Sequence, residues 1–218
     1  MLESLFNEDP SSNIVSNNSS IYYTCICQNT RGLRTKTSNF YVSVCSMNFS
    51  IICLTEPRLS KDILNSELFP ENITVYRADR KFVARDKTRG GGVLIAHKDY
   101  ISSHEILLNA YDIPPEIDIV CISLHHIAKR IYLIVLYIPP NVCKSSYDTF
   151  LENLCNFPSE LRGDIIVMGD FNTPHLENPC DPRSRSLHNF DDFCNLKQVN
   201  SIRNSSNRLL DLVFTSLE

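Results

Sequence analysis

The chain has 218 residues, of which 43% are hydrophobic and 21% are charged. These proportions are ordinary for a globular protein, and the length suffices for one sizeable α/β domain or two small ones. The formal net charge of -4 gives no overall attraction to nucleic acid, so any such contact must come from a local patch. No apolar run approaches the length that a membrane-spanning helix needs.

Cysteine is unusually frequent, with nine residues, an odd number. Most lie inside apolar runs, as Cys53 and Cys121 do, where a thiol behaves as a small hydrophobic group. No pair of Cys/His doublets has zinc-finger spacing, and the acidic start of the chain does not match a secretory signal. We therefore expect reduced thiols and an intracellular protein. Residues 1–20 are mostly polar, with Ser and Asn crowded together from residue 11 onward, which predicts a disordered tail.

From residue 21 onward, β-rich runs alternate with amphipathic helical patterns, which indicates an α/β fold. Two of the β runs are separated by only a short loop and should form a hairpin. The predicted strands cover residues 21–28, 50–55, 73–79, 91–97, 117–124, 130–137, 165–168, 196–202 and 209–215. The predicted helices cover residues 35–45, 145–157 and 186–194.

The segment from Ile165 to Met168 is a run of four apolar residues, which predicts a buried strand. Gly169, Asp170 and Asn172 follow it directly. In an extended chain alternate residues share a face, so we expect Asp170 and Asn172 to point the same way. The glycine would allow a ligand or another backbone to approach closely. A strand followed by an Asx-type turn explains the same residues without any site.

Polar residues also stand at the ends of other predicted strands. Asn29 and Glu56 follow the first two strands, and Tyr137 closes the sixth. Asp211 lies among apolar residues in the last strand, where an ionised carboxylate needs a partner. Each residue alone is more often a turn or packing residue. Together they predict one polar site at the strand ends.

A local basic segment runs from Arg77 to Lys98, with seven Lys and Arg residues against two Asp. The resulting charge of +5 suggests a surface for nucleic-acid phosphates, although a solvated loop has the same composition. The three glycines at 90–92 lack the ending of a nucleotide-binding loop, and a close backbone approach explains them better. The arginines that we expect to contact DNA are Arg31, Arg34, Arg77, Arg80 and Arg89.

An ordered set of motifs resembles the endonuclease/exonuclease/phosphatase superfamily, and within it the apurinic-type endonuclease domain of non-LTR retrotransposons. The motifs are Gln28–Arg34, Cys53–Glu56, Arg89–Ile95, Leu136–Pro140, Gly169–Asn172 and Leu210–Ser216. The likeness covers roughly residues 21–218. It implies a four-layer sandwich like that of DNase I, with two packed mixed β-sheets flanked by helices.

The resemblance also implies a role for each polar residue. Glu56, with Asn29 beside it, would bind Mg²⁺, with Mn²⁺ as an alternative. Asp170 would orient or deprotonate the attacking water, and Asn172 would hold water or a phosphate oxygen. Tyr137 would donate to the phosphate. The product would be a nick in DNA with a 3′-hydroxyl, which a reverse transcriptase domain of a longer polyprotein would use in the nucleus.

The chain departs from the family pattern at its end. The family closes its site with a Ser-Asp-His motif after the strand that holds Asp211, and Asp211 would orient that histidine. No such motif follows here, so residues 21–218 are expected to lack the last strand and the histidine, with impaired activity. Two alternatives remain open: a phosphatase or phosphodiesterase of the same fold that acts on small phosphoesters, and an inactive remnant that binds DNA.

Overall fold

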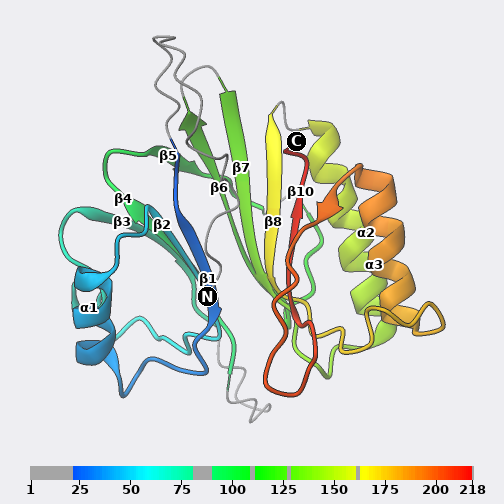
Figure 1. The fold of residues 1–218 in the computed structure, drawn as a ribbon, viewed down its shortest axis with the longest axis horizontal. Helices are drawn as coiled ribbons and strands as arrows, with labels where there is room; N and C mark the ends of the chain where they lie inside the picture. The colour runs from blue at the N-terminus through cyan, green and yellow to red at the C-terminus, as the bar shows by residue number, and fades with distance from the viewer. Residues whose placement is uncertain (1–21, 81–89, 109–110, 127–128, 161–162, 218) are drawn as a thin grey trace, which may run out of the picture.

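The protein is built as two β-sheets packed face to face, with helices on both outer faces (Figure 1). This computed structural model describes residues 22–80, 90–108, 111–126, 129–160 and 163–217. The predicted tail, residues 1–20, lies outside the described residues, as do residues 81–89 of the basic segment, which contain four of its seven Lys and Arg residues, including Arg89. No helix in the described part of the chain is long and apolar enough to cross a membrane.

The first sheet has four strands and is mixed. Strands β1 and β2 run parallel, whereas β4 is antiparallel to both of its neighbours, β2 and β3. The parallel pair brings the carboxyl ends of β1 and β2 to one edge of the sheet. In spatial order the strands are β1 (Cys25–Asn29), β2 (Ile51–Thr55), β4 (Val93–Lys98) and β3 (Ile73–Ala78).

The second sheet has six strands and is also mixed. Only β7 and β8 are parallel neighbours in it, so the carboxyl ends of these two strands lie side by side. Strand β10 runs antiparallel to β8, which places the start of β10 beside the end of β8. In spatial order the strands are β5 (Ser102–Glu105), β6 (Asp118–His126), β7 (Lys129–Tyr137), β8 (Asp164–Asp170), β10 (Asp211–Thr215) and β9 (Lys197–Gln198).

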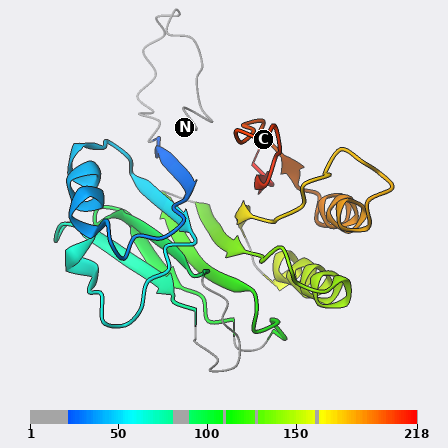
Figure 2. The same ribbon diagram turned by 90° about the horizontal axis from the view of Figure 1, so that it is seen from below.

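The helices form the two outer layers, as the turned view confirms (Figure 2). Helix α1 (Thr37–Ser46) covers the first sheet, and α2 (Lys144–Glu160) and α3 (Pro182–Cys194) cover the second. A 3₁₀ turn, η1 (Asn65–Glu67), lies in the connection before β3. The ends of helix α3 are fixed by its capping residues. Asp181 caps the start by accepting hydrogen bonds from the backbone N–H groups of Arg183 and Ser184. Asn195 ends the helix in the left-handed conformation.

Three apolar clusters hold these four layers together. The middle cluster fills the space between the sheets, with Cys53 and Ile95 from one sheet meeting Val135 and Met168 from the other. The two outer clusters join α1 to the first sheet, and α2 and α3 to the second. Apolar residues on both faces of the central strands explain why those strands read as continuous hydrophobic runs.

The predicted strands and helices are present in the structure, with small differences in their bounds. The hairpin of β6 and β7 is confirmed by an antiparallel register that pairs Asp118 with Tyr137. The predicted strand over 196–202 shortens to two residues, Lys197–Gln198. Strand β5 was not predicted, because Ser102–Glu105 contains no apolar residue.

Candidate active site

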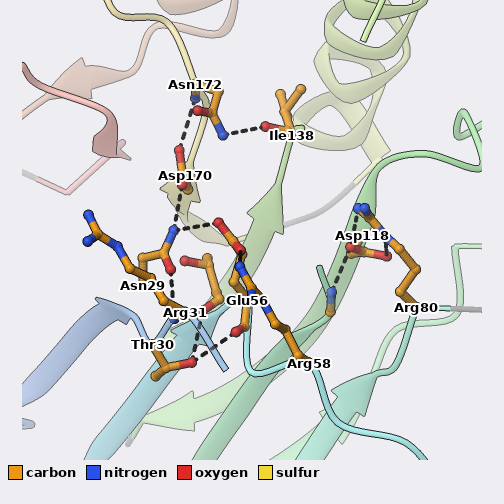
Figure 3. Close-up of polar contacts among 12 residues, drawn as sticks. Asn29, Thr30, Arg31, Glu56, Arg58, Arg80, Asp118, Ile138, Asp170 and Asn172 are labelled. Carbon is orange, nitrogen blue, oxygen red and sulfur yellow. Dashed lines mark hydrogen bonds and ion pairs between the residues drawn. The ribbon is translucent and has the colours of Figure 1, made fainter. Parts of the chain in front are cut away.

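Polar residues from five strands meet at one end of the space between the two sheets, and Figure 3 shows three of them, Asn29, Glu56 and Asp170. Asn29 ends β1 and Glu56 follows β2 in the first sheet, whereas Tyr137 and Asp170 end β7 and β8 in the second. Asp211 begins β10 and pairs with Asp170 across the sheet. The predicted convergence of strand ends is therefore present in the fold.

Asn29 joins the two sheets directly. Its Nδ2 donates to Glu56 Oε1 at 3.0 Å and to Asp170 Oδ2 at 2.8 Å. Its Oδ1 accepts from the backbone N–H of Arg31 at 3.0 Å, which fixes the orientation of the amide. Asn29 therefore turns a donor, and not an oxygen ligand, toward both carboxylates.

Glu56 is held in a strained backbone conformation. Its φ is 49°, in the left-handed region, and its N–H donates to Gly92 O at 3.0 Å. Its Oε2 accepts from Arg58 Nη2 at 2.7 Å, and a side-chain hydrogen bond joins it to Tyr137. Arg58 also belongs to the site, and it was not among the residues predicted for the site from the sequence. Its spacing of two from Glu56 was the available signal.

Asp170 is buried, and its carboxyl group has a strongly raised pKa. Desolvation first, and then the nearby carboxylates of Asp211 and Glu56, raise its pKa to about 7. The N–H groups of Asn29 and Asn172 act in the opposite direction but do not cancel these effects. A carboxylate with a pKa near neutrality accepts and releases protons readily at the pH of the cell.

Asp211 lies directly opposite Asp170 in the register of β8 and β10. Burial raises its pKa, and the Arg31 guanidinium works against this shift. Its Oδ1 is buried, and no described residue donates a hydrogen bond to it. Two like charges on opposed residues destabilise a sheet unless another group compensates them. The Oδ1 atom of Asp211 is therefore an acceptor that no described residue uses.

The prediction that Asn172 shares a face with Asp170 assumed an extended chain, which does not continue past Asp170. Strand β8 ends at Asp170, and Asn172 adopts a φ of 47°, which breaks the alternation of an extended chain. Its N–H donates to Asp170 Oδ1 at 3.1 Å, and its Nδ2 donates to Ile138 O at 2.8 Å. The Asx turn and the site are therefore both present, with Asn172 fixing the carboxylate of Asp170 through its backbone.

Tyr137 lies between the carboxylates and Arg80. Burial, followed by the charges of Glu56 and Asp170, raises its pKa well above the usual value, so the phenol keeps its proton. The guanidinium carbon of Arg80 lies 5.3 Å from the ring centroid, within cation–π range. Arg80 is held there by an ion pair of 2.6 Å with buried Asp118, which sequence reasoning missed.

The glycines of the site provide close approach, as predicted. A Cβ on Gly91 would lie 2.4 Å from the Arg80 guanidinium carbon and 2.6 Å from Asp118 Oδ2. A Cβ on Gly169 would lie 1.9 Å from Leu136 O in the neighbouring strand. Backbone and side chains, and not a phosphate, fill the space beside these glycines in the structure.

The predicted DNA-binding arginines fall in different places. Arg31 and Arg80 flank the site, and Arg34 is exposed and donates to Ser60 Oγ at 3.1 Å. Arg77 lies on the outer side of the first sheet, where its guanidinium donates to Ser60 O, Ile63 O, Asn65 Oδ1 and Asp79 Oδ2. The structure therefore does not bring Arg77 to the site.

The site residues as arranged do not fit a bound Mg²⁺. Glu56 offers hard oxygen ligands of the right type, but Asn29 donates to one of its oxygens and Arg58 to the other. The Asn29 oxygen is engaged by the backbone of Arg31. Among the described residues, no group of three or more His, Cys, Asp or Glu side chains is placed to hold a metal ion.

Sequence comparison finds no relative of this chain. No protein-family profile matches it, and no curated protein matches it. The likeness to known proteins therefore rests on the structure.

Several solved structures share the fold at low sequence identity. The endonuclease domain of TRAS1, a telomere-specific non-LTR retrotransposon, is 16% identical with a TM-score of 0.64, covering 88% of this chain and 83% of that one. The AP endonuclease LMAP from Leishmania major is 15% identical with a TM-score of 0.63, covering 89% and 79%.

An endonuclease/exonuclease/phosphatase family protein from Leptotrichia buccalis is 14% identical with a TM-score of 0.60, covering 90% of this chain and 88% of that one. The 3′ phosphatase NExo from Neisseria, solved with a product DNA hairpin, is 15% identical with the same TM-score of 0.60, covering 89% and 87%. The chain therefore has the DNase I-like fold of the endonuclease/exonuclease/phosphatase proteins.

Proposed function

We propose that this chain is a DNA endonuclease that hydrolyses a phosphodiester bond and leaves a 3′-hydroxyl. The single observation that carries the proposal is the Asn29–Glu56–Asp170 bridge between the two sheets. A retrotransposon origin, a reverse transcriptase partner domain and action in the nucleus are parts of the same proposal. They rest on the ordered motifs and on the likeness to the TRAS1 domain.

Each residue has a role that fits its surroundings. Asp170, with its pKa near 7, takes the proton of the attacking water. Tyr137 stays protonated and donates to the phosphate as charge grows on it. Asn29 holds both carboxylates in place, and Arg31 and Arg80 provide positive charge beside the site. Mg²⁺ or Mn²⁺ remains a predicted requirement that the assay must test.

The direct test is nicking of supercoiled plasmid with Mg²⁺, with Mn²⁺ and with EDTA, using the wild-type chain and Asp170→Asn. The Asn172 N–H and Asn29 amide contacts are retained in part by the new amide oxygen, so the fold should survive. We expect Asp170→Asn to lose activity by about 10²-fold or more, because the proton acceptor is removed. Asp62→Asn, at an exposed position away from the site, should nick like the wild type.

The same preparation distinguishes the two alternatives. Turnover of a small phosphoester with no plasmid nicking would move the assignment to a phosphatase or phosphodiesterase of small substrates. Salt-sensitive DNA binding without cleavage, also after extension of the chain with a Ser-Asp-His segment, would identify an inactive DNA-binding protein. Nicking that survives Asp170→Asn would contradict the proposed mechanism.

A further inference from the structure

Arg58 occupies the position at Glu56 where an external cation would be expected. Its Nη2 lies 2.7 Å from Glu56 Oε2, in an ion pair whose carboxylate side chain is only 14% exposed. The other carboxylate oxygen accepts from Asn29. Figure 3 shows Arg58 and Asn29 on Glu56 from different sides. Both oxygens therefore already have donors from within the chain.

The surrounding backbone forms a slot for this arginine. A Cβ on Gly32 would lie 3.2 Å from Arg58 Cδ, and a Cβ on Gly90 would lie 3.8 Å from Arg58 Nε. Arg58 itself has a φ of 53°, and its N–H donates to Gly91 O at 3.0 Å. Two glycines flank the side chain, and a left-handed backbone aims it at Glu56, so the contact is built into the fold.

The carboxylates of the site place several negative charges close together, and Arg58 offsets part of this charge. The charges of Asp211 and Glu56 raise the pKa of Asp170, and the charge of Glu56 also raises the pKa of Asp211. Of the two arginines that flank the site, Arg31 acts on Asp211, and Arg80 is paired with Asp118. Arg58 therefore supplies the cation that this group of carboxylates needs when no divalent ion is bound.

We propose that Arg58 is an internal counter-ion that competes with divalent cations for Glu56, so that a metal ion binds there only when Arg58 leaves. A guanidinium and a divalent ion on one carboxylate oxygen repel each other at contact distance, so the presence of Arg58 weakens the binding of the ion. The proposal concerns metal affinity alone and holds whether or not the chain cleaves DNA.

The test measures Mn²⁺ binding without DNA, from the electron paramagnetic resonance signal of the free ion. We expect Arg58→Gln to bind Mn²⁺ at least about tenfold more tightly than the wild type. The gain should disappear in the Arg58→Gln/Glu56→Gln double variant, because the ligand is then removed. Arg203→Gln, which removes an ion pair at an exposed position elsewhere, serves as the matched control and should bind like the wild type.

A conservative variant distinguishes the effect of the positive charge of Arg58 from the effect of its side-chain shape. Arg58→Lys keeps a cation near Glu56, so its Mn²⁺ affinity should stay close to that of the wild type even if Arg58→Gln is poorly folded. Three results would overturn the proposal: unchanged affinity in folded Arg58→Gln, tighter binding that persists in the double variant, or Arg58→Lys binding as tightly as Arg58→Gln. Because plasmid nicking is not the readout, a failure here is distinct from a failure of the proposed endonuclease activity.

Discussion

At the scale of single residues, Asp170 links the chemistry of the site to the stability of the protein. Its pKa is about 7 in the folded chain, against 3.8 for a free carboxyl. The folded state therefore holds the proton more tightly than the unfolded state does. By linkage, the free energy of unfolding falls as pH rises from about 4 through 7, by up to about 4 kcal/mol.

This gives a prediction for Asp170→Asn. The substitution removes the titrating group, so the loss of stability between pH 5 and pH 8 should shrink by a few kcal/mol. Urea unfolding at both pH values, with EDTA present, measures it. Asp62→Asn should keep the wild-type dependence. If the free energy of unfolding of Asp170→Asn depends on pH as that of the wild type does, another group titrates in this range.

Tyr137 supports a second prediction at this scale. Tyr137→Phe removes the hydroxyl that is hydrogen-bonded to Glu56 and proposed to meet the phosphate, and keeps the buried ring. Plasmid nicking should slow by about 10- to 100-fold, with little change in the midpoint of thermal unfolding. If stability falls and the nicking rate per folded molecule stays the same, the hydroxyl is structural.

At the scale of elements, the pair β7 and β8 depends on the absence of a side chain at Gly169. Its φ is 142°, and a Cβ there would lie 1.9 Å from Leu136 O. Gly169→Ala should therefore force the two strands apart and cost at least about 3 kcal/mol in the free energy of unfolding.

Chemical denaturation of the purified variant, or its soluble yield, measures this effect. Ser205→Ala, in an exposed turn, is the control and should leave the free energy of unfolding and the soluble yield unchanged. A stable, soluble Gly169→Ala protein would show that β7 and β8 are less rigidly paired than their register indicates.

The sequence was sufficient to predict the elements whose residues carry an unambiguous apolar pattern. Strands such as β7 and β8 are apolar on both faces, whereas β5 is entirely polar and is held by pairing with β6, which no local pattern encodes. The site residues were predictable because they stand where apolar runs stop. The orientation of Asn172 could not be predicted, because it depends on the left-handed backbone of Asn172 itself, two residues after the end of the strand.

The contact between Arg58 and Glu56 could not be predicted from the sequence either. Its position after Glu56 and Pro57 was visible in the sequence, but its aim at the carboxylate comes from its own left-handed backbone and from two glycines on other segments. Likewise, nothing in the sequence distinguishes Arg77, which bonds four groups of the outer layer, from the arginines beside the site.

At the scale of the whole molecule, the net charge of -4 means that the proposed DNA binding would depend on a few local arginines. Arg31→Gln should weaken DNA binding and reduce the slope of log K against log salt by about 1, with little change in stability. Arg77→Ala should instead destabilise the fold by about 3 kcal/mol, because it leaves several partly buried acceptors, including the Asp79 carboxylate, unpaired.

Fluorescence anisotropy with a labelled duplex at several salt concentrations, together with urea unfolding of each variant, tests this pair. The two variants are matched in type, since each removes one guanidinium. A reduced salt slope in Arg77→Ala with unchanged stability would place DNA on the outer side of the first sheet, contrary to this assignment.

The active-site residues are divided between two sheets that share no hydrogen-bonded strand pair among the described strands. The distance between Glu56 and Asp170 is therefore set by the thickness of the apolar layer between the sheets, and Asn29 spans whatever gap that layer leaves. Enlarging Val135 would push the two halves of the site apart without touching a polar group. In this fold a substitution in the central core therefore also changes the geometry of the candidate site.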